Sequence, residues 1–412
     1  MKNGALVDII NKNGQTPLFH AVSVGHVFKN CTLKQASVRD MKGRTPIFEA
    51  LIHAQMSSFE RLLKLKVNVK LADNEGMNLV HHAVSDPKLF PFLKILLARK
   101  TDPGVSARTK RGETALHLAC KVGNHAALGL LLVSGFLYPI SKEFLNCQDE
   151  NGATAIRLAI DAKSAMCVQS LLSKDCDATL KDETGTTPVR AALLNSANKC
   201  AKLLFNTTAS VISEVTSTNL VLETAKVGNK DGLSILMNAI PMTSLKDVLT
   251  NVDDDGFDVM ALCVVNNMIT SVQDLIKSKC SSAKEWRNPD DDGNLLHLAV
   301  SHGVSIKILD ALIGAGVQTR HGDCDGVNPI HVAAKYGHKD LVNALAPLSV
   351  DLRDGKGMTA VHYAAQHGRR GCLEILIKHG HHLDLKDEEG KTPVDCASSS
   401  LGVWISSMLC SK

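Results

Sequence analysis

The clearest pattern of apolar and polar positions occupies residues 111–133. A polar turn ending at Gly112 precedes Thr114, and apolar side chains then recur at the three- to four-residue spacing of a helix. Gly123 suits the left-handed conformation that ends many helices, and an apolar second helix follows at 126–133. The pattern therefore predicts a pair of short helices that is too small to bury its own apolar face.

The same pattern recurs along the whole chain, at intervals of 29 to 40 residues. Every position equivalent to Thr114 holds Thr, Asn or Asp, the side chains that cap a first helical turn. These twelve positions are Thr16, Thr45, Asn78, Thr114, Thr154, Thr187, Asn219, Asp258, Asn294, Asn328, Thr359 and Thr392. Five residues further on, ten of the twelve positions hold Ala, which lets two helices approach closely. The sequence therefore predicts stacked helix pairs.

These residues resemble the ankyrin repeat, whose unit of about 33 residues begins its first helix with Thr-Pro-Leu-His-x-Ala. The best matches are Thr-Ala-Leu-His-Leu-Ala at 114–119, Asn-Pro-Ile-His-Val-Ala at 328–333 and Thr-Ala-Val-His-Tyr-Ala at 359–364. The resemblance covers residues 4–410 and implies an all-α ankyrin-repeat solenoid of stacked helix-turn-helix units with hairpin-like fingers. It departs in the first repeat, whose second helix is short and polar, and at Leu222 and Ala261, where His is usual.

We expect a single array over residues 1–412. Its units are predicted to start near residues 14, 43, 76, 112, 152, 185, 217, 256, 292, 326, 357 and 390. Extra residues near 136–144, 205–217 and 281–288 are expected to lie in loops, and the Ser/Thr-rich run 206–218 is a candidate joint. Residues 4–11 resemble the end of a preceding repeat, which favours a segment of a longer array.

The amino-acid composition indicates how the core is built and in which compartment the protein is expected. Aromatic residues make up only 4% of the chain, so the core must be built from Leu, Ala, Val and Ile. The twelve Cys are scattered without a Cys-x-x-Cys pair, which favours a reducing compartment. Since the sequence has neither a membrane-spanning apolar run nor a signal-peptide core, it predicts a cytoplasmic or nuclear protein without direct membrane insertion.

The candidate chemical sites have structural explanations. His81, His117, His297, His331 and His362 share one position in the repeat, where an imidazole can bond locally and to the neighbouring unit. His379, His381 and His382 invite a metal site, but no carboxylate or Cys is spaced to complete it. Gly390-Lys-Thr lacks the upstream Gly of a phosphate loop. The sequence therefore predicts no catalytic residues, no cofactor and no metal.

The remaining candidate is a surface. Acidic residues gather in three consecutive predicted fingers, and the candidate partner-binding residues are Asp253, Asp254, Asp255, Asp290, Asp291, Asp292, Asp323 and Asp325. Residues 1–113 carry 18 Lys and Arg against 9 Asp and Glu, although the whole chain is only +4. The acidic fingers are either ordinary solvated turns or a stripe that orients a basic peptide segment. Nucleic acid is not expected, because basic residues are scattered and aromatic stacking residues are scarce.

The resemblance implies a non-catalytic protein–protein interaction module, acting as a scaffold, adaptor or inhibitor through its concave finger and helix surface. The alternative is a regulatory cytoplasmic ankyrin domain cut from a larger protein, such as an ion channel or signalling protein. An effector delivered into a host cell by a parasite or bacterium is a third class. The sequence leaves the partner, the pathway and the oligomeric state open.

Overall fold

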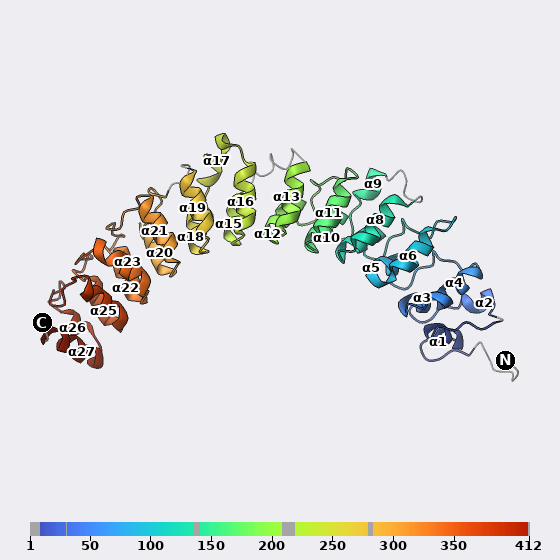
Figure 1. Ribbon diagram of the computed structural model, residues 1–412, viewed down its shortest axis with the longest axis horizontal. Coiled ribbons are helices and arrows are strands. Elements are labelled where there is room, and N and C mark those ends of the chain that lie inside the picture. Colours follow the sequence, from blue (N-terminus) through green and yellow to red (C-terminus); the bar gives the residue numbers. More distant parts are fainter. Residues whose placement is uncertain (1–8, 30, 135–140, 208–218, 279–282, 411–412) are drawn as a thin grey trace. The chain divides into compact units, whose positions relative to one another are not determined.

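The structure is a computed structural model that describes residues 9–29, 31–134, 141–207, 219–278 and 283–410 (Figure 1). The chain divides into two compact units, Met1–Val211 (unit 1) and Ile212–Lys412 (unit 2). Residues 208–218 of the predicted joint lie outside the described residues. Among the described residues, no helix has the length and apolar character needed to cross a membrane.

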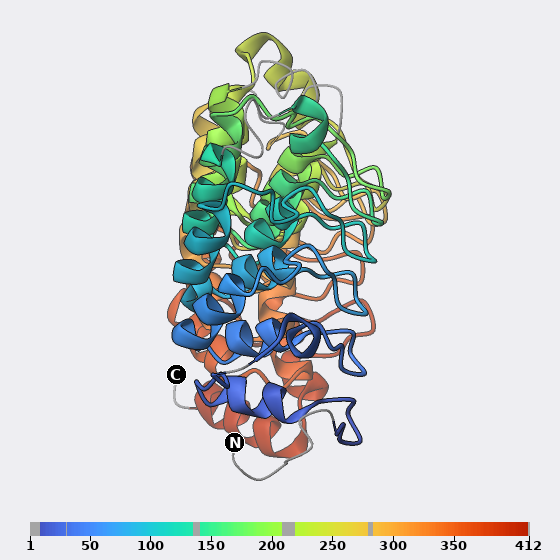
Figure 2. The ribbon, with the colours of Figure 1, turned by 90° about the vertical axis from the view of Figure 1, so that its right-hand side faces the viewer.

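Unit 1 consists of short helices in consecutive antiparallel pairs. The helices are α1 (Pro17–Ser23), α2 (Leu33–Ala36), α3 (Pro46–Ile52), α4 (Met56–Lys64), α5 (Leu79–Ser85), η1 (Pro87–Leu89), α6 (Phe90–Leu97), α7 (Ala115–Lys121), α8 (His125–Val133), α9 (Lys142–Leu145), α10 (Ala155–Asp161), α11 (Ala165–Leu172), α12 (Pro188–Leu194) and α13 (Asn198–Thr207). For this unit, Figure 2 shows two rows of helices with the long loops, or fingers, projecting to one side.

Unit 2 repeats the same arrangement. Its helices are α15 (Leu220–Lys226), α16 (Lys230–Ala239), α17 (Met242–Leu249), α18 (Val259–Val265), α19 (Ile269–Lys277), α20 (Leu295–Ser301), α21 (Ile306–Gly314), α22 (Pro329–Tyr336), α23 (Lys339–Leu345), η2 (Ala346–Leu348), α24 (Ala360–Gln366), α25 (Arg370–Lys378), α26 (Pro393–Cys396) and α27 (Ser399–Cys410). First helices pack against first helices, as α22 does against α24. The predicted all-α fold of stacked pairs is confirmed.

Each of the twelve predicted cap residues directly precedes an α-helix. Thr154, for example, accepts a hydrogen bond from the backbone N–H of Arg157 at 3.4 Å, and Asp258 accepts one from Ala261 at 2.8 Å. Asn219 departs because its backbone is not extended, and neither it nor Thr16 or Thr45 makes a side-chain cap bond. Most of the small residues five positions later, such as Ala119 and Ala333, are fully buried between the helices, whereas Ala21 and Ala397 in the first and last repeats are partly exposed.

The fingers are hairpin-like turns joined to their neighbours by backbone hydrogen bonds. In unit 1, Asn74 N–H donates to the Lys42 carbonyl at 2.9 Å, and Lys110 N–H donates to the Glu75 carbonyl at 2.9 Å. In unit 2, Cys324 N–H donates to the Asp291 carbonyl at 2.8 Å. Consecutive fingers are therefore held side by side, which fixes the spacing of the side chains at their tips.

Of two irregular helices, α2 and α17, the sequence predicted the first and not the second. The second helix of the first repeat is the four-residue α2, as its short polar sequence predicted. The extra helix α17 was not predicted. It lies between α16 and the finger at 253–257, and its apolar residues Leu245, Val248 and Leu249 are buried.

Candidate functional site

Most fingers begin with an aspartate that holds the turn together. Its Oδ1 accepts hydrogen bonds from the backbone N–H groups two and four residues further along, as the Asp323 Oδ1 does from Asp325 at 3.0 Å and Val327 at 2.9 Å. The same paired bonds are made by Asp40, Asp73, Asp149, Asp182, Asp253 and Asp354. One carboxylate oxygen of each residue thus holds the turn. The other oxygen, Oδ2, can bind a second group.

In five fingers a hydrogen-bond or ion-pair partner within the same unit engages that second oxygen. The partners are Arg44 for Asp40, His82 for Asp73, Arg157 for Asp182, Lys226 for Asp253 and Tyr363 for Asp354, at 2.8 to 3.4 Å. Two of these donors, His82 and Tyr363, lie nine residues after their aspartate, on the first helix. These five carboxylates have a protein partner for both oxygens.

Asp323 has no such partner in the part of the chain that the structure describes. The residue nine positions later is Val332, which cannot donate a hydrogen bond. Among the described residues, no hydrogen bond or ion pair engages the Asp323 Oδ2. Instead, Asp323 and Val332 both line a groove of about 340 Å³ in unit 2. A half-buried carboxylate oxygen is therefore available to a ligand that enters the groove.

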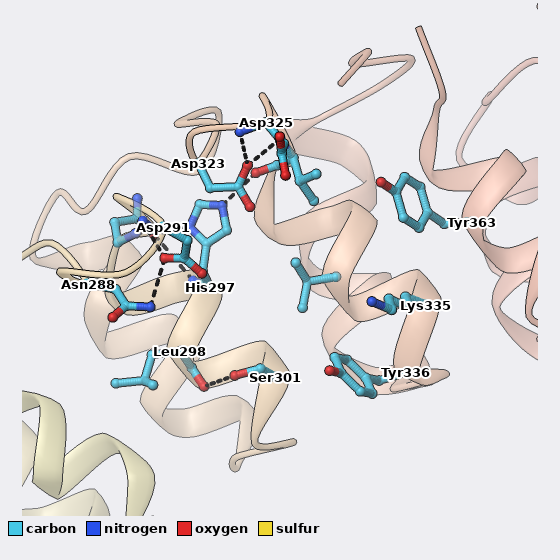
Figure 3. Close-up of a pocket in the computed structure, with 14 residues that line it drawn as sticks. Asn288, Asp291, His297, Leu298, Ser301, Asp323, Asp325, Lys335, Tyr336 and Tyr363 are labelled. Atoms are coloured by element: carbon cyan, nitrogen blue, oxygen red, sulfur yellow. Dashed lines mark hydrogen bonds between the residues drawn. The ribbon is translucent and has the colours of Figure 1, made fainter. Parts of the chain in front are cut away.

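The groove, which we call the acidic groove, runs over α20, α22 and α24. Its lining residues are Asn288, Asp291, Gly293, Asn294, His297, Leu298, Ser301, Asp323, Asp325, Val327, Val332, Lys335, Tyr336 and Tyr363. Figure 3 shows the three aspartates and Ser301 on one side and the two tyrosines with Lys335 on the other. Three carboxylates and one ammonium give the lining an excess of negative charge.

The aromatic side of the groove is partly exposed. Tyr336 is 47% exposed, and the Lys335 Nζ lies 5.7 Å from the centroid of its ring. The Tyr363 hydroxyl donates to the Asp354 Oδ2 at 2.8 Å. Burial and this carboxylate both raise the pKa of Tyr363, so its phenol stays neutral. Aromatic faces beside free carboxylates suit a cation with an apolar stem, as Lys and Arg side chains have.

The five repeated histidines have the structural role that their shared position predicted. In each histidine, Nδ1 accepts from the backbone N–H of the cap residue, and Nε2 donates to a backbone carbonyl 21 to 36 residues further along, toward the next repeat. For His297, at the edge of the groove, these distances are 3.0 Å to Asn294 and 2.8 Å to Val327. Burial lowers the pKa of His297, which keeps the imidazole neutral.

The structure brings only three of the eight candidate aspartates into the groove, namely Asp291, Asp323 and Asp325. The other five are Asp253, Asp254, Asp255, Asp290 and Asp292. Asp253 is paired with Lys226, and Asp292 faces His321, whose Nε2 donates to its carbonyl at 2.9 Å. Asp254, Asp255 and Asp290 are exposed on finger turns outside the groove lining.

Sequence reasoning missed Tyr336 and Tyr363. The signal was present, because both lie on first helices whose register the caps define, eight and four residues after their caps.

The three histidines of the cluster at 379–382 each bond a protein group. His381 is buried with Nε2 on the Ala346 carbonyl at 3.2 Å, while His379 bonds Asn343 and His382 bonds Asp351. In the described part of the chain, no group of three His, Cys, Asp or Glu is placed to hold a metal ion.

Comparison with known protein families places ankyrin repeats along much of the chain. A model of three ankyrin repeats matches residues 80–182 and 259–354, and a second ankyrin-repeat model matches residues 341–397. The first match includes α20 and α22, and the second includes α24. All three helices of the acidic groove therefore lie within matched repeats.

Curated relatives match over parts of their length. The chain is 25% identical over 206 residues to human Inversin, 29% over 167 residues to the chicken nuclear factor NF-kappa-B p105 subunit, and 34% over 92 residues to the Drosophila melanogaster E3 ubiquitin-protein ligase Ufd4. These matches cover 49%, 39% and 22% of this chain. They span only 18%, 16% and 3% of the relatives' own lengths.

Proposed function

We propose that this chain, which belongs to the ankyrin-repeat family, is a protein-interaction module whose acidic groove binds a basic segment of another protein. Repeats of this kind build extended surfaces, and each unit contacts mainly its neighbours. The observation that carries the proposal is the Asp323 Oδ2, which has no partner among the described residues and lies in a groove that also holds Asp291, Asp325 and two tyrosines.

The energetics favour a cationic side chain as the anchor. A hydrogen bond to a charged group contributes about 1.5–3 kcal/mol, and an aromatic face adds about 0.5–2 kcal/mol to a nearby cation. The Asp323 carboxylate already has one oxygen fixed by two backbone N–H groups, so its orientation is set before a ligand arrives. Binding therefore orders little of the protein, which lowers its entropic cost.

We also propose a non-catalytic role, as a scaffold, adaptor or inhibitor. Both ring nitrogens of His297 are occupied by backbone groups, and the Tyr363 hydroxyl is bound to Asp354. These titratable groups hold the repeat together, so they are not free to transfer protons to a substrate. The groove is accordingly suited to binding another protein and not to catalysing a reaction.

The test compares two variants that each remove two charges. Asp323→Asn/Asp325→Asn alters the groove, while Asp254→Asn/Asp255→Asn alters the neighbouring acidic finger. Asparagine at position 323 retains the oxygen that holds the turn, and the finger variant leaves Asp253 unchanged, so the fold should survive in both, as equal circular dichroism would verify. The probe is a fluorescent peptide of alternating arginine and glycine, titrated at physiological salt with fluorescence anisotropy as the readout.

We expect the groove variant to bind at least tenfold more weakly and the finger variant to change less than threefold, since one lost charged hydrogen bond corresponds to roughly a tenfold effect. Tyr336→Ala should also weaken binding. Equal losses in both double variants would instead indicate a diffuse acidic stripe. Undiminished binding by the groove variant would refute the proposal.

A further inference from the structure

A cluster of cations occupies the second helices of two neighbouring repeats in unit 1. We call it the basic edge and define it as Arg61, Lys64, Lys66, Lys94, Arg99 and Lys100. Arg61 and Lys64 lie on α4, Lys94 lies on α6, and the other three lie in the turns that follow these helices. In the described part of the chain, none of the six side chains makes an ion pair or a hydrogen bond.

The two helices and their turns are in direct contact. The rings of Phe59 on α4 and Phe92 on α6 meet edge to face at a centroid distance of 5.0 Å. The turns are joined by an ion pair of 3.0 Å between the Lys70 Nζ and the Asp102 Oδ2. The basic edge therefore lies on two neighbouring second helices, and on the turns that follow them, which contact each other.

Repeat register aligns the cations in rows. Arg61 and Lys94 occupy equivalent positions, sixteen residues after the caps Thr45 and Asn78. Lys66 and Arg99 are likewise equivalent, twenty-one residues after those caps. Each row joins the repeat that contains α4 to the repeat that contains α6. A linear ligand that runs across the repeats would therefore meet both cations of a row in turn.

Two local features distinguish the basic edge. The Arg99 Nε is buried but donates no hydrogen bond within the described residues, although an unmet buried donor is costly. Lys66 has a left-handed backbone with φ of 59°, two residues after its helix, where Gly316 and Gly380 stand in unit 2. A lysine is strained in this conformation, whereas glycine is not.

Favourable interaction with the helix ends explains only part of the pattern. Cations are stabilised near helix C-termini, and α4 and α6 both end here. That effect would not leave the Arg99 Nε without an acceptor. Within these helices and turns the acidic residues are Glu60 and Asp102, and Asp102 is already paired with Lys70. The cluster thus has little internal compensation of its charge.

We propose that the basic edge binds an acidic segment of another protein. Compact phosphate groups are usually held by free backbone N–H groups at helix N-termini, but here the turn N–H groups of Lys66 and Arg99 are bonded to the Leu63 and Leu96 carbonyls. Recognition must therefore come from long side chains. Neighbouring helices pack about 8–10 Å apart, which matches roughly three residues of extended chain at about 3.3 Å each.

The experiment uses the full chain and a fluorescent peptide with glutamate at every third position. Arg61→Glu/Lys94→Glu reverses one row of the basic edge. Lys42→Glu/Lys110→Glu is the matched control, because it reverses two exposed cations on fingertips of the same unit. Vesicles of phosphatidylcholine with phosphatidylserine are the second probe. Amide hydrogen exchange verifies that both variants retain the fold.

We expect the peptide to bind the unaltered chain with an affinity that falls as salt rises, and the row reversal to weaken it at least tenfold. The fingertip control should change less than threefold. Equal losses in both variants would overturn the proposal, since they would reflect only net charge. Absence of peptide binding, or row-dependent binding of vesicles alone, would also overturn it. Asp323→Asn should leave this binding unchanged, so the result is independent of the acidic groove.

Discussion

The bridging histidine His81 provides a direct test of how one repeat is fastened to the next. Its side chain is 0% exposed. The Nδ1 accepts from the Asn78 N–H at 3.1 Å, and the Nε2 donates to the Ala107 carbonyl at 3.1 Å. His81→Ala removes both bonds and leaves a buried N–H and a buried carbonyl unpaired. We expect a local destabilisation of about 2–4 kcal/mol at neutral pH.

The same residue predicts a dependence on pH. Burial lowers the pKa of His81 to about 4, while the unfolded chain should titrate near about 6.5. Because the folded pKa is depressed, the stabilisation is fully present above about pH 6.5 and is lost as the pH falls toward about 4. At pH 5 this linkage corresponds to a loss of about 2 kcal/mol from His81 alone.

Amide hydrogen exchange measured by mass spectrometry is the suitable assay, because the two tryptophans, Trp286 and Trp404, both report on unit 2. After correction for intrinsic rates, exchange in α5 should accelerate about thirtyfold between pH 7.5 and pH 5. In His81→Ala it should be fast at both pH values, with a smaller pH effect. His125→Ala, which alters an exposed histidine on α8, is the control. The reasoning is refuted if His81→Ala exchanges like the unaltered chain, or retains its full pH dependence.

Three further predictions concern packing and the groove. Gly76→Ala should lower the urea midpoint of unit 1, since φ is 78° and the added Cβ would lie 2.8 Å from the Lys110 backbone nitrogen of the next finger. Ala119→Leu should cost about 1–3 kcal/mol by overpacking a fully buried site between helices, again read from urea unfolding. Tyr363→Phe should cost about 1 kcal/mol by freeing the Asp354 carboxylate, measured through tryptophan fluorescence of unit 2.

The sequence was sufficient to predict the helix pairs, because their determinants are local. A capping side chain and a small residue five positions later mark each first helix, as Thr114 and Ala119 do, and both are buried as expected. The helix α17 could have been found, since Leu245, Val248 and Leu249 have helical spacing. It was missed because the repeat pattern assigned those residues to the connection between helix and finger.

The acidic groove was harder to predict, because it depends on which side chain faces a given carboxylate. Acidic composition alone treated Asp253 and Asp323 as equivalent, yet Lys226 neutralises the first, whereas no described residue engages the second oxygen of Asp323. The positions of Tyr336 and Tyr363 were fixed by repeat register. Their approach to one groove, however, requires the packing of α22 on α24.

Asp323 also shows why binding can vary in this fold without loss of stability. One oxygen of the carboxylate holds the finger, and no described residue binds the other. In the next repeat the same second oxygen is bound by Tyr363, so the Asp354 carboxylate contributes to the fold. A donor nine residues after the aspartate, such as Tyr363, therefore makes the carboxylate part of the fold, whereas Val332 at the equivalent position provides no donor and the turn remains intact.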